Sequence, residues 1–162
     1  MTSASGGSRN PANNLAGPQE FTWLIDNFIA EVPGVTDALV MASDGLLLTA
    51  SGAVTREVGE QLAAISSGLL SLGHNGAALV GRGSCEQIML RLTRGHLLFM
   101  RIGETAGLAV LTAVGCDLKV IAFEMAQLVQ RVGHALTPQA RRQLQHMAAS
   151  RAIRGLTANR GD

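Results

Sequence analysis

A chain of 162 residues and 16.9 kDa has the size of one domain. Its net charge of +1 gives no electrostatic reason to expect nucleic acid or an acidic membrane as the main partner. Hydrophobic residues make up 47% of the chain and charged residues 15%, which is more apolar surface than a monomer of this size readily buries and favours a covered partner face.

The first 18 residues are rich in Ser, Gly, Asn and Pro and show no apolar periodicity, so residues 1–18 are predicted to form a disordered arm. They contain no apolar signal-peptide core, and no apolar run reaches the roughly 20 residues that span a bilayer. We therefore expect a cytoplasmic protein that does not insert into a membrane.

A short helix is predicted from Glu20 to the helix-ending pair Pro33-Gly34. Its apolar residues recur on one face of a helix. These residues are Phe21, Leu24, Ile25, Phe28 and Ile29.

A β-hairpin follows the first helix. Residues 35–42 and 46–50 are two apolar runs that flank Asp44-Gly45, which is among the stronger short-range hairpin signals.

The second helix is predicted over residues 55–72, with Thr55 as its N-cap and with Gly73 and Gly76 marking its end. Its large apolar residues recur at alternating spacings of four and three, which predicts one face packed on the sheet. That face comprises Val58, Leu62, Ile65, Leu69 and Leu72.

The second half of the chain is predicted to contain three strands and one strong helix. Residues 86–93, 96–102 and 108–114 are joined by short glycine-containing turns, which indicates an antiparallel meander. Asp117 begins the helix. Its apolar face comprises Leu118, Ile121, Met125, Leu128 and Val132.

The remaining residues, 137–162, are predicted to form a C-terminal extension. Thr137-Pro138 is typical of a helix start, so residues 138–152 are expected to form a weaker helix, followed by a loose tail from about Ala152. Residues 19–136 would then form the domain. The fold class is α+β, with a five-stranded antiparallel sheet flanked by helices in the order α-β-β-α-β-β-β-α and layered as in profilin.

No catalytic group, cofactor site or metal site is predicted. The four histidines are scattered, and Cys85 and Cys116 lie far apart without a CxxC partner. Gly81-Arg82-Gly83 has neither the third glycine of a dinucleotide site nor the G-K-[ST] of a phosphate loop. We therefore expect a protein that is not an enzyme.

The second helix offers a surface for self-association. Its small-residue flank could receive another helix, and residues 86–93 could lie at an open sheet edge. The alternative is that these small residues allow close packing inside one subunit. The predicted dimer interface consists of Ala63, Ala64, Ser67, Leu70, Met89 and Arg91.

Residues 21–132 resemble the bacterial roadblock/dynein light chain domain over about two thirds of the chain. The resemblance lies in residues 21–28 followed by Val32-Pro33-Gly34-Val35, in the hairpin over residues 38–46, in the helix over residues 60–69 and in the strand over residues 107–111. The arginine-rich composition and both extensions are similar to the actinobacterial conservon version, which occurs beside a sensor-kinase-like protein and a small GTPase.

The resemblance implies a homodimer that regulates or scaffolds a small Ras-like GTPase within a bacterial signalling complex, peripheral to a membrane. In the gliding-motility relative, the dimer reshapes the GTPase switch region and supplies no catalytic arginine. Neither Arg56 nor Arg94 is identified as an arginine finger, so activation of hydrolysis is left open beside simple binding. The GTPase contact is not assigned to residues.

A small-molecule sensor is the alternative, because antiparallel sheets flanked by helices also occur in PAS-like and GAF-like domains. Against it, the predicted core is filled by Leu, Ile, Val, Met and Ala, and few polar residues are placed to orient a ligand.

Overall fold

The computed structural model describes residues 18–158, which form four helices and one five-stranded sheet. Apart from Pro18, the predicted arm lies outside the described residues, as do residues 159–162. The elements are α1 (Pro18–Glu31), β1 (Val35–Ala42), β2 (Leu47–Ser51), α2 (Arg56–Leu79), β3 (Gln87–Leu92), β4 (Gly95–Ile102), β5 (Ala106–Thr112), α3 (Leu118–Ala135) and α4 (Pro138–Ala158). The predicted α+β fold and element order are confirmed.

The sheet is antiparallel throughout, with the strand order β2-β1-β5-β4-β3. The predicted hairpin is confirmed: the Leu46 amide donates to Asp44 Oδ1 at 3.2 Å, and Gly45 has a φ of 88° that glycine adopts without a steric penalty. Pairing of β1 with β5, with Leu39 opposite Ala109, joins this hairpin to the β3-β4-β5 meander. β2 and β3 are therefore the two edges of the sheet.

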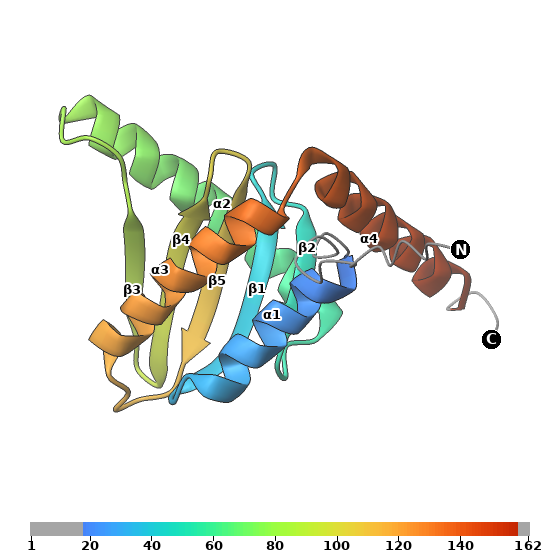
Figure 1. Ribbon diagram of the computed structural model, residues 1–162, viewed down its shortest axis with the longest axis horizontal. Helices are drawn as coiled ribbons and strands as arrows, with labels where there is room; N and C mark the ends of the chain where they lie inside the picture. Colours follow the sequence, from blue (N-terminus) through green and yellow to red (C-terminus); the bar gives the residue numbers. More distant parts are fainter. Residues whose placement is uncertain (1–17, 159–162) are drawn as a thin grey trace, which may run out of the picture.

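Helices cover both faces of the sheet (Figure 1). α1 and α3 lie on one face, over the larger core, and α2 crosses the other face. The predicted inner face of α3 is confirmed, since Ile121, Met125, Leu128 and Val132 are all buried. The smaller core beneath α2 comprises Leu39, Met41, Ala63, Leu70, Leu97, Phe99 and Ala109.

Side-chain caps begin three of the helices as the sequence predicts. The Thr55 hydroxyl accepts from the Val58 amide at 3.4 Å, and Asp117 accepts from the Lys119 and Val120 amides. At α4 the Thr137 hydroxyl accepts from the Ala140 amide at 3.1 Å. Each cap satisfies an amide that has no partner within its helix.

Two helix ends differ from the prediction. α2 continues through Gly73 and Gly76 to Leu79, because a glycine inside a helix costs only about 1 kcal/mol and packing can offset that cost. A Cβ at Gly73 would lie 2.8 Å from Ile88 Cδ1, so glycine is what lets α2 pass β3 closely. α4 extends to Ala158, beyond the expected loose start at Ala152.

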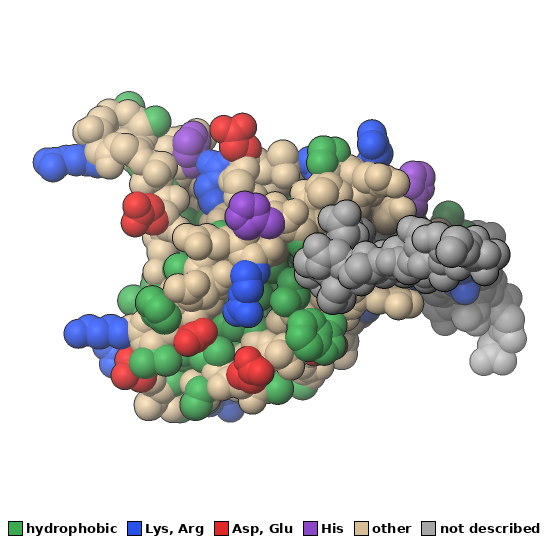
Figure 2. Space-filling view, viewed as in Figure 1, with side chains coloured by type: hydrophobic (Ala, Val, Ile, Leu, Met, Phe, Trp, Pro, Cys, Tyr) green, Lys and Arg blue, Asp and Glu red, His purple; other side chains and the backbone are tan. Residues whose placement is uncertain are grey.

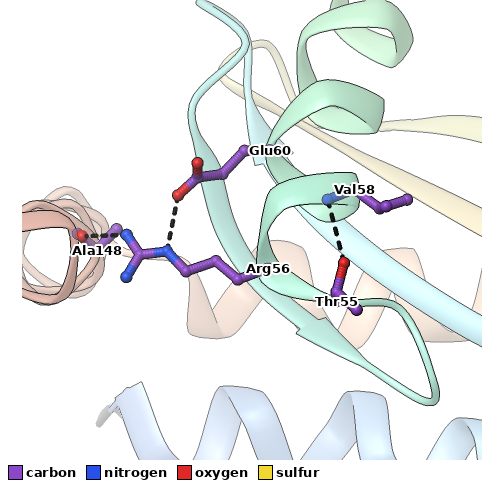
Figure 3. Close-up of polar contacts among 5 residues, drawn as sticks. All are labelled: Thr55, Arg56, Val58, Glu60 and Ala148. Atoms are coloured by element: carbon purple, nitrogen blue, oxygen red, sulfur yellow. Dashed lines mark hydrogen bonds and ion pairs between the residues drawn. The ribbon is translucent and has the colours of Figure 1, made fainter. Parts of the chain in front are cut away.

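α4 packs beside the edge strand β2 (Figure 1). Ala140 and Leu144 are buried, and Leu144 belongs to the larger core. Farther along α4, the Arg56 Nη2 atom donates to the Ala148 carbonyl oxygen at 3.0 Å, while Nε pairs with Glu60 at 2.7 Å (Figure 3). This contact ties the start of α2 to α4.

Candidate functional site

Three small residues and one leucine form the side of α2 that faces the sheet. Gly59, Ala63, Ser66 and Leu70 are buried, and a Cβ at Gly59 would lie 3.2 Å from Leu47 Cδ2. The helix therefore approaches the sheet closely. This arrangement corrects the predicted sheet-facing side for Val58, Ile65 and Leu72, which are exposed, while Leu62 and Leu69 are half-buried and pack against the smaller core as predicted.

Three of those large residues are instead exposed along one flank of the helix, and Leu79, beyond the predicted end, continues their line. Val58, Ile65, Leu72 and Leu79, here called the α2 stripe, have exposed fractions of 47%, 55%, 68% and 87%. They recur every seven residues, so they fall nearly in line along a helix. A continuous exposed apolar line of this kind is typical of a surface that another protein covers.

The strand β3 lies at the edge nearest the C-terminal part of α2. It pairs with β4 alone among the described strands, and the edge position predicted for residues 86–93 is thereby confirmed. Met89 and Leu92 are 51% and 47% exposed. An edge strand presents backbone N–H and C=O groups that another strand can pair with.

The α2 stripe and the β3 edge belong to one surface. Leu62 and Leu69, which lie beside the stripe on α2, are half-buried and pack against the smaller core, as do Ile88 and Leu90 of β3. Half-buried apolar residues thus connect the exposed stripe to the exposed edge. Together they form an apolar surface beside an open ladder of backbone groups.

The opposite flank of α2, here called the turn flank, contacts the β1–β2 turn. A Cβ built at Gly45 would lie 3.2 Å from Ser67 Oγ and 3.3 Å from Ala64 Cα, so these two residues rest against the turn of their own subunit. Ala64 is exposed and Ser67 half-buried. The turn flank is polar compared with the stripe.

The structure separates the six predicted interface residues into three groups. Ala63 and Leu70 are 0% and 7% exposed within their own subunit, which corrects their assignment to an outward face. Ala64 and Ser67 lie on the turn flank. Met89 and Arg91 are exposed on the β3 edge, and their contact with a second copy stays a prediction. The sequence shows the seven-residue spacing of the stripe, but it does not show that these residues point away from the sheet.

The histidines, cysteines and acidic residues of the described part of the chain form no metal-binding cluster. No three His, Cys, Asp or Glu side chains among residues 18–158 are arranged to hold a metal ion. His96 Nδ1 lies 3.3 Å from the Thr112 hydroxyl, and Cys85 and Cys116 are both half-buried free thiols. None of the described helices is long and apolar enough to cross a bilayer.

Comparison with known proteins identifies the fold. The model of the Roadblock/LC7 domain family matches residues 21–112. The chain is 32% identical to the Roadblock/LC7 domain of Streptomyces avermitilis, with a TM-score of 0.65, covering 68% of this chain and 92% of that chain. No curated protein matches it.

Two more distant structures have the same fold. Myxococcus xanthus MglB is 13% identical with a TM-score of 0.66, covering 71% of this chain and 93% of that one. The gliding protein MglB of Thermus thermophilus is 17% identical with a TM-score of 0.65, covering 75% of this chain and 95% of that one. At these identities the likeness concerns the fold alone.

Proposed function

The chain belongs to the Roadblock/LC7 family, a family of regulatory domains, and from that premise we propose that it is a non-enzymatic homodimer that regulates or scaffolds a small Ras-like GTPase. The observation that carries the proposal is the α2 stripe beside the open β3 edge. In this proposal, two copies pair their α2 helices along the stripes and join their β3 strands into one continuous sheet.

The character of the surface supports a second copy of this chain as its occupant. A seven-residue apolar repeat is the pattern with which one helix packs along another, and the same repeat on both helices makes the surface self-complementary. The open N–H and C=O groups of β3 could also pair with the β3 strand of a second copy that runs antiparallel to it. The interface proposed here is thus the stripe flank of α2 and not its turn flank.

The role toward the GTPase is proposed as one of binding and positioning. A regulator without catalytic groups acts by contacting one nucleotide state of its partner more favourably than the other, which shifts the populations of the switch region. Arg56 is held by Glu60 and Ala148 in this structure, which argues against its use as an arginine finger. Arg94 lies exposed in the β3–β4 turn.

Light scattering after size exclusion tests the proposal directly. The full chain is run alone and with the small GTPase encoded nearest in the genome, loaded with GDP or with a GTP analogue. We expect a dimer that retains the GTP-analogue form more strongly than the GDP form. A monomer that binds neither form would refute both parts, and a dimer without nucleotide-dependent binding would refute the regulatory part.

Two neighbouring positions provide a matched test of the interface. Ile65 is on the stripe and Ala64 on the turn flank, and both are exposed. Ile65→Arg should yield monomers because it places a charge in an apolar contact, whereas Ala64→Arg should remain dimeric. A dimeric Ile65→Arg and a monomeric Ala64→Arg would instead place the interface on the small-residue flank. Circular dichroism of both variants controls for folding.

A further inference from the structure

A small hollow lies on the turn flank of α2, enclosed by the β1–β2 and β4–β5 turns. It has a volume of about 170 Å³, and its apolar lining includes Met41, Leu70 and Ala106. The Ser43 amide donates to the Thr105 carbonyl oxygen at 2.9 Å, which ties the two turns together. A Cβ at Gly107 would lie 2.5 Å from Leu70 Cδ1, so α2 is seated closely on the floor of the hollow.

A histidine, an arginine and a glutamate gather where this hollow meets its wider neighbour. His74, Arg101 and Glu104 line the hollow and also a shallower depression of about 890 Å³ between the end of α2, β3 and α3. They come from α2, β4 and the β4–β5 turn. Figure 2 shows a histidine, a basic and an acidic side chain close together at the upper end of β4 and β5. His74, Arg101 and Glu104 are here called the mouth of the hollow.

The two opposite charges at the mouth are not committed to each other. The Arg101 Nη2 atom donates to the backbone oxygen of Glu104 at 3.4 Å, which leaves the carboxylate out of that contact. Among residues 18–158, no side chain forms an ion pair with the Glu104 carboxylate. A guanidinium and a carboxylate thus line one concave site with charge available to a ligand that carries both signs.

Size and lining narrow the class of ligand. A volume of 170 Å³ corresponds to about six water molecules, below the roughly 300 Å³ at which pockets for drug-sized ligands begin. The apolar lining suits a short aliphatic group. Ser43, Ser67 and Ser71 add hydroxyl groups along the walls that can accept or donate.

We propose that this hollow binds a small aliphatic α-amino acid. Arg101 would bind the carboxylate, Glu104 the ammonium group, and the apolar floor the side chain. The site is on the flank of α2 opposite the stripe, so a dimer formed through the stripe leaves it open. The proposal therefore does not depend on the proposed function, and either can fail alone.

Isothermal titration calorimetry of the full chain with L-leucine, L-valine and L-methionine tests the proposal. We expect saturable binding of at least one of the three. Arg101→Gln and Glu104→Gln should each weaken it at least about tenfold, because each removes a charge-assisted contact. The matched control is Arg94→Gln, which removes an exposed arginine from a turn outside the hollow and should leave affinity unchanged.

Ligand analogues extend the test to the unaltered protein. N-acetyl-L-leucine lacks the ammonium group and L-leucinamide lacks the carboxylate, so both should bind at least about tenfold more weakly than L-leucine. Glu104→Gln should not weaken the binding of N-acetyl-L-leucine any further, because this ligand has no ammonium group for Glu104 to contact. Absence of binding by all three amino acids up to about 10 mM would overturn the proposal, since that concentration occupies most of a millimolar site. Equal binding of the analogues would overturn it as well.

Discussion

The two edge strands of the sheet differ in what lies beside them. At one edge, β2 packs beside α4, and Leu48 of β2 and Leu144 of α4 are both buried in the larger core. At the other edge, β3 has strand pairing on one side only, and Met89 and Leu92 are about half exposed. α4 follows the segment that matches the family, and β3 lies within it.

One edge strand of the sheet is thus covered by the same chain, and in the proposed dimer the other would pair with a second copy. An exposed edge is a template for pairing, and proteins either cover it or use it. Here a helix of the same chain occupies the β2 side, so in the proposed dimer only β3 would be open to a second copy. A covered edge and an open edge together favour a closed pair of subunits over an extended array.

The largest effect is expected from opening the covered edge. Leu144→Ala should lower the free energy of unfolding by about 3 kcal/mol, because it removes a buried side chain that is 3% exposed and leaves a cavity. Met147→Ala, on the same helix but 39% exposed, should cost less than about 1 kcal/mol. Urea unfolding of both variants measures the difference. Equal, small losses would show that α4 does not close the β2 side.

An intermediate effect is expected from a charge placed on the open edge. Met89→Lys should raise the dissociation constant of the dimer about tenfold, since lysine at an edge discourages strand pairing. The control adds the same charge beside the covered edge: Gln143→Lys, at an exposed position of α4, should leave association unchanged. Sedimentation of a dilution series compares them. If both variants associate like the original protein, β3 is not part of the interface.

The smallest effect is expected at the tether between α2 and α4. Arg56→Ala removes the ion pair with Glu60 and the hydrogen bond to Ala148 (Figure 3). The side chains of Arg56 and Glu60 are 41% and 50% exposed, so solvent screening should limit the loss of unfolding free energy to less than about 1 kcal/mol. A loss above about 2 kcal/mol in urea unfolding would mean that the tether, and not Leu144, holds α4 in place.

Local signals in the sequence were sufficient for most of the fold. The Asp44-Gly45 turn has few alternatives to a hairpin, and the caps at Thr55 and Asp117 act within one turn of their helix. On α3, the large apolar residues are also the buried ones, so periodicity alone identifies the inner face. Such features depend on neighbours in sequence, which a single chain displays.

The candidate site depends on distant neighbours and was predicted only in part. Periodicity along α2 reveals an apolar line, but it cannot tell whether the sheet of the same subunit or another molecule covers it. The sheet instead receives Gly59 and Ala63, since small residues allow a close approach that Val58 or Ile65 would prevent. The hollow at Arg101 was not predicted, because its walls come from α2 and from two turns far apart in sequence.

The seven-residue spacing of the α2 stripe also bears on the accuracy of assembly. Sliding one helix along its partner by seven residues, about 10 Å, would place apolar residues opposite apolar residues again, so the stripe by itself tolerates slippage. Paired β3 strands have no such freedom, because a shift of one residue turns every side chain to the other face of the sheet. In the proposed dimer the α2 helices would hold the two subunits together, and the β3 strands would set their register.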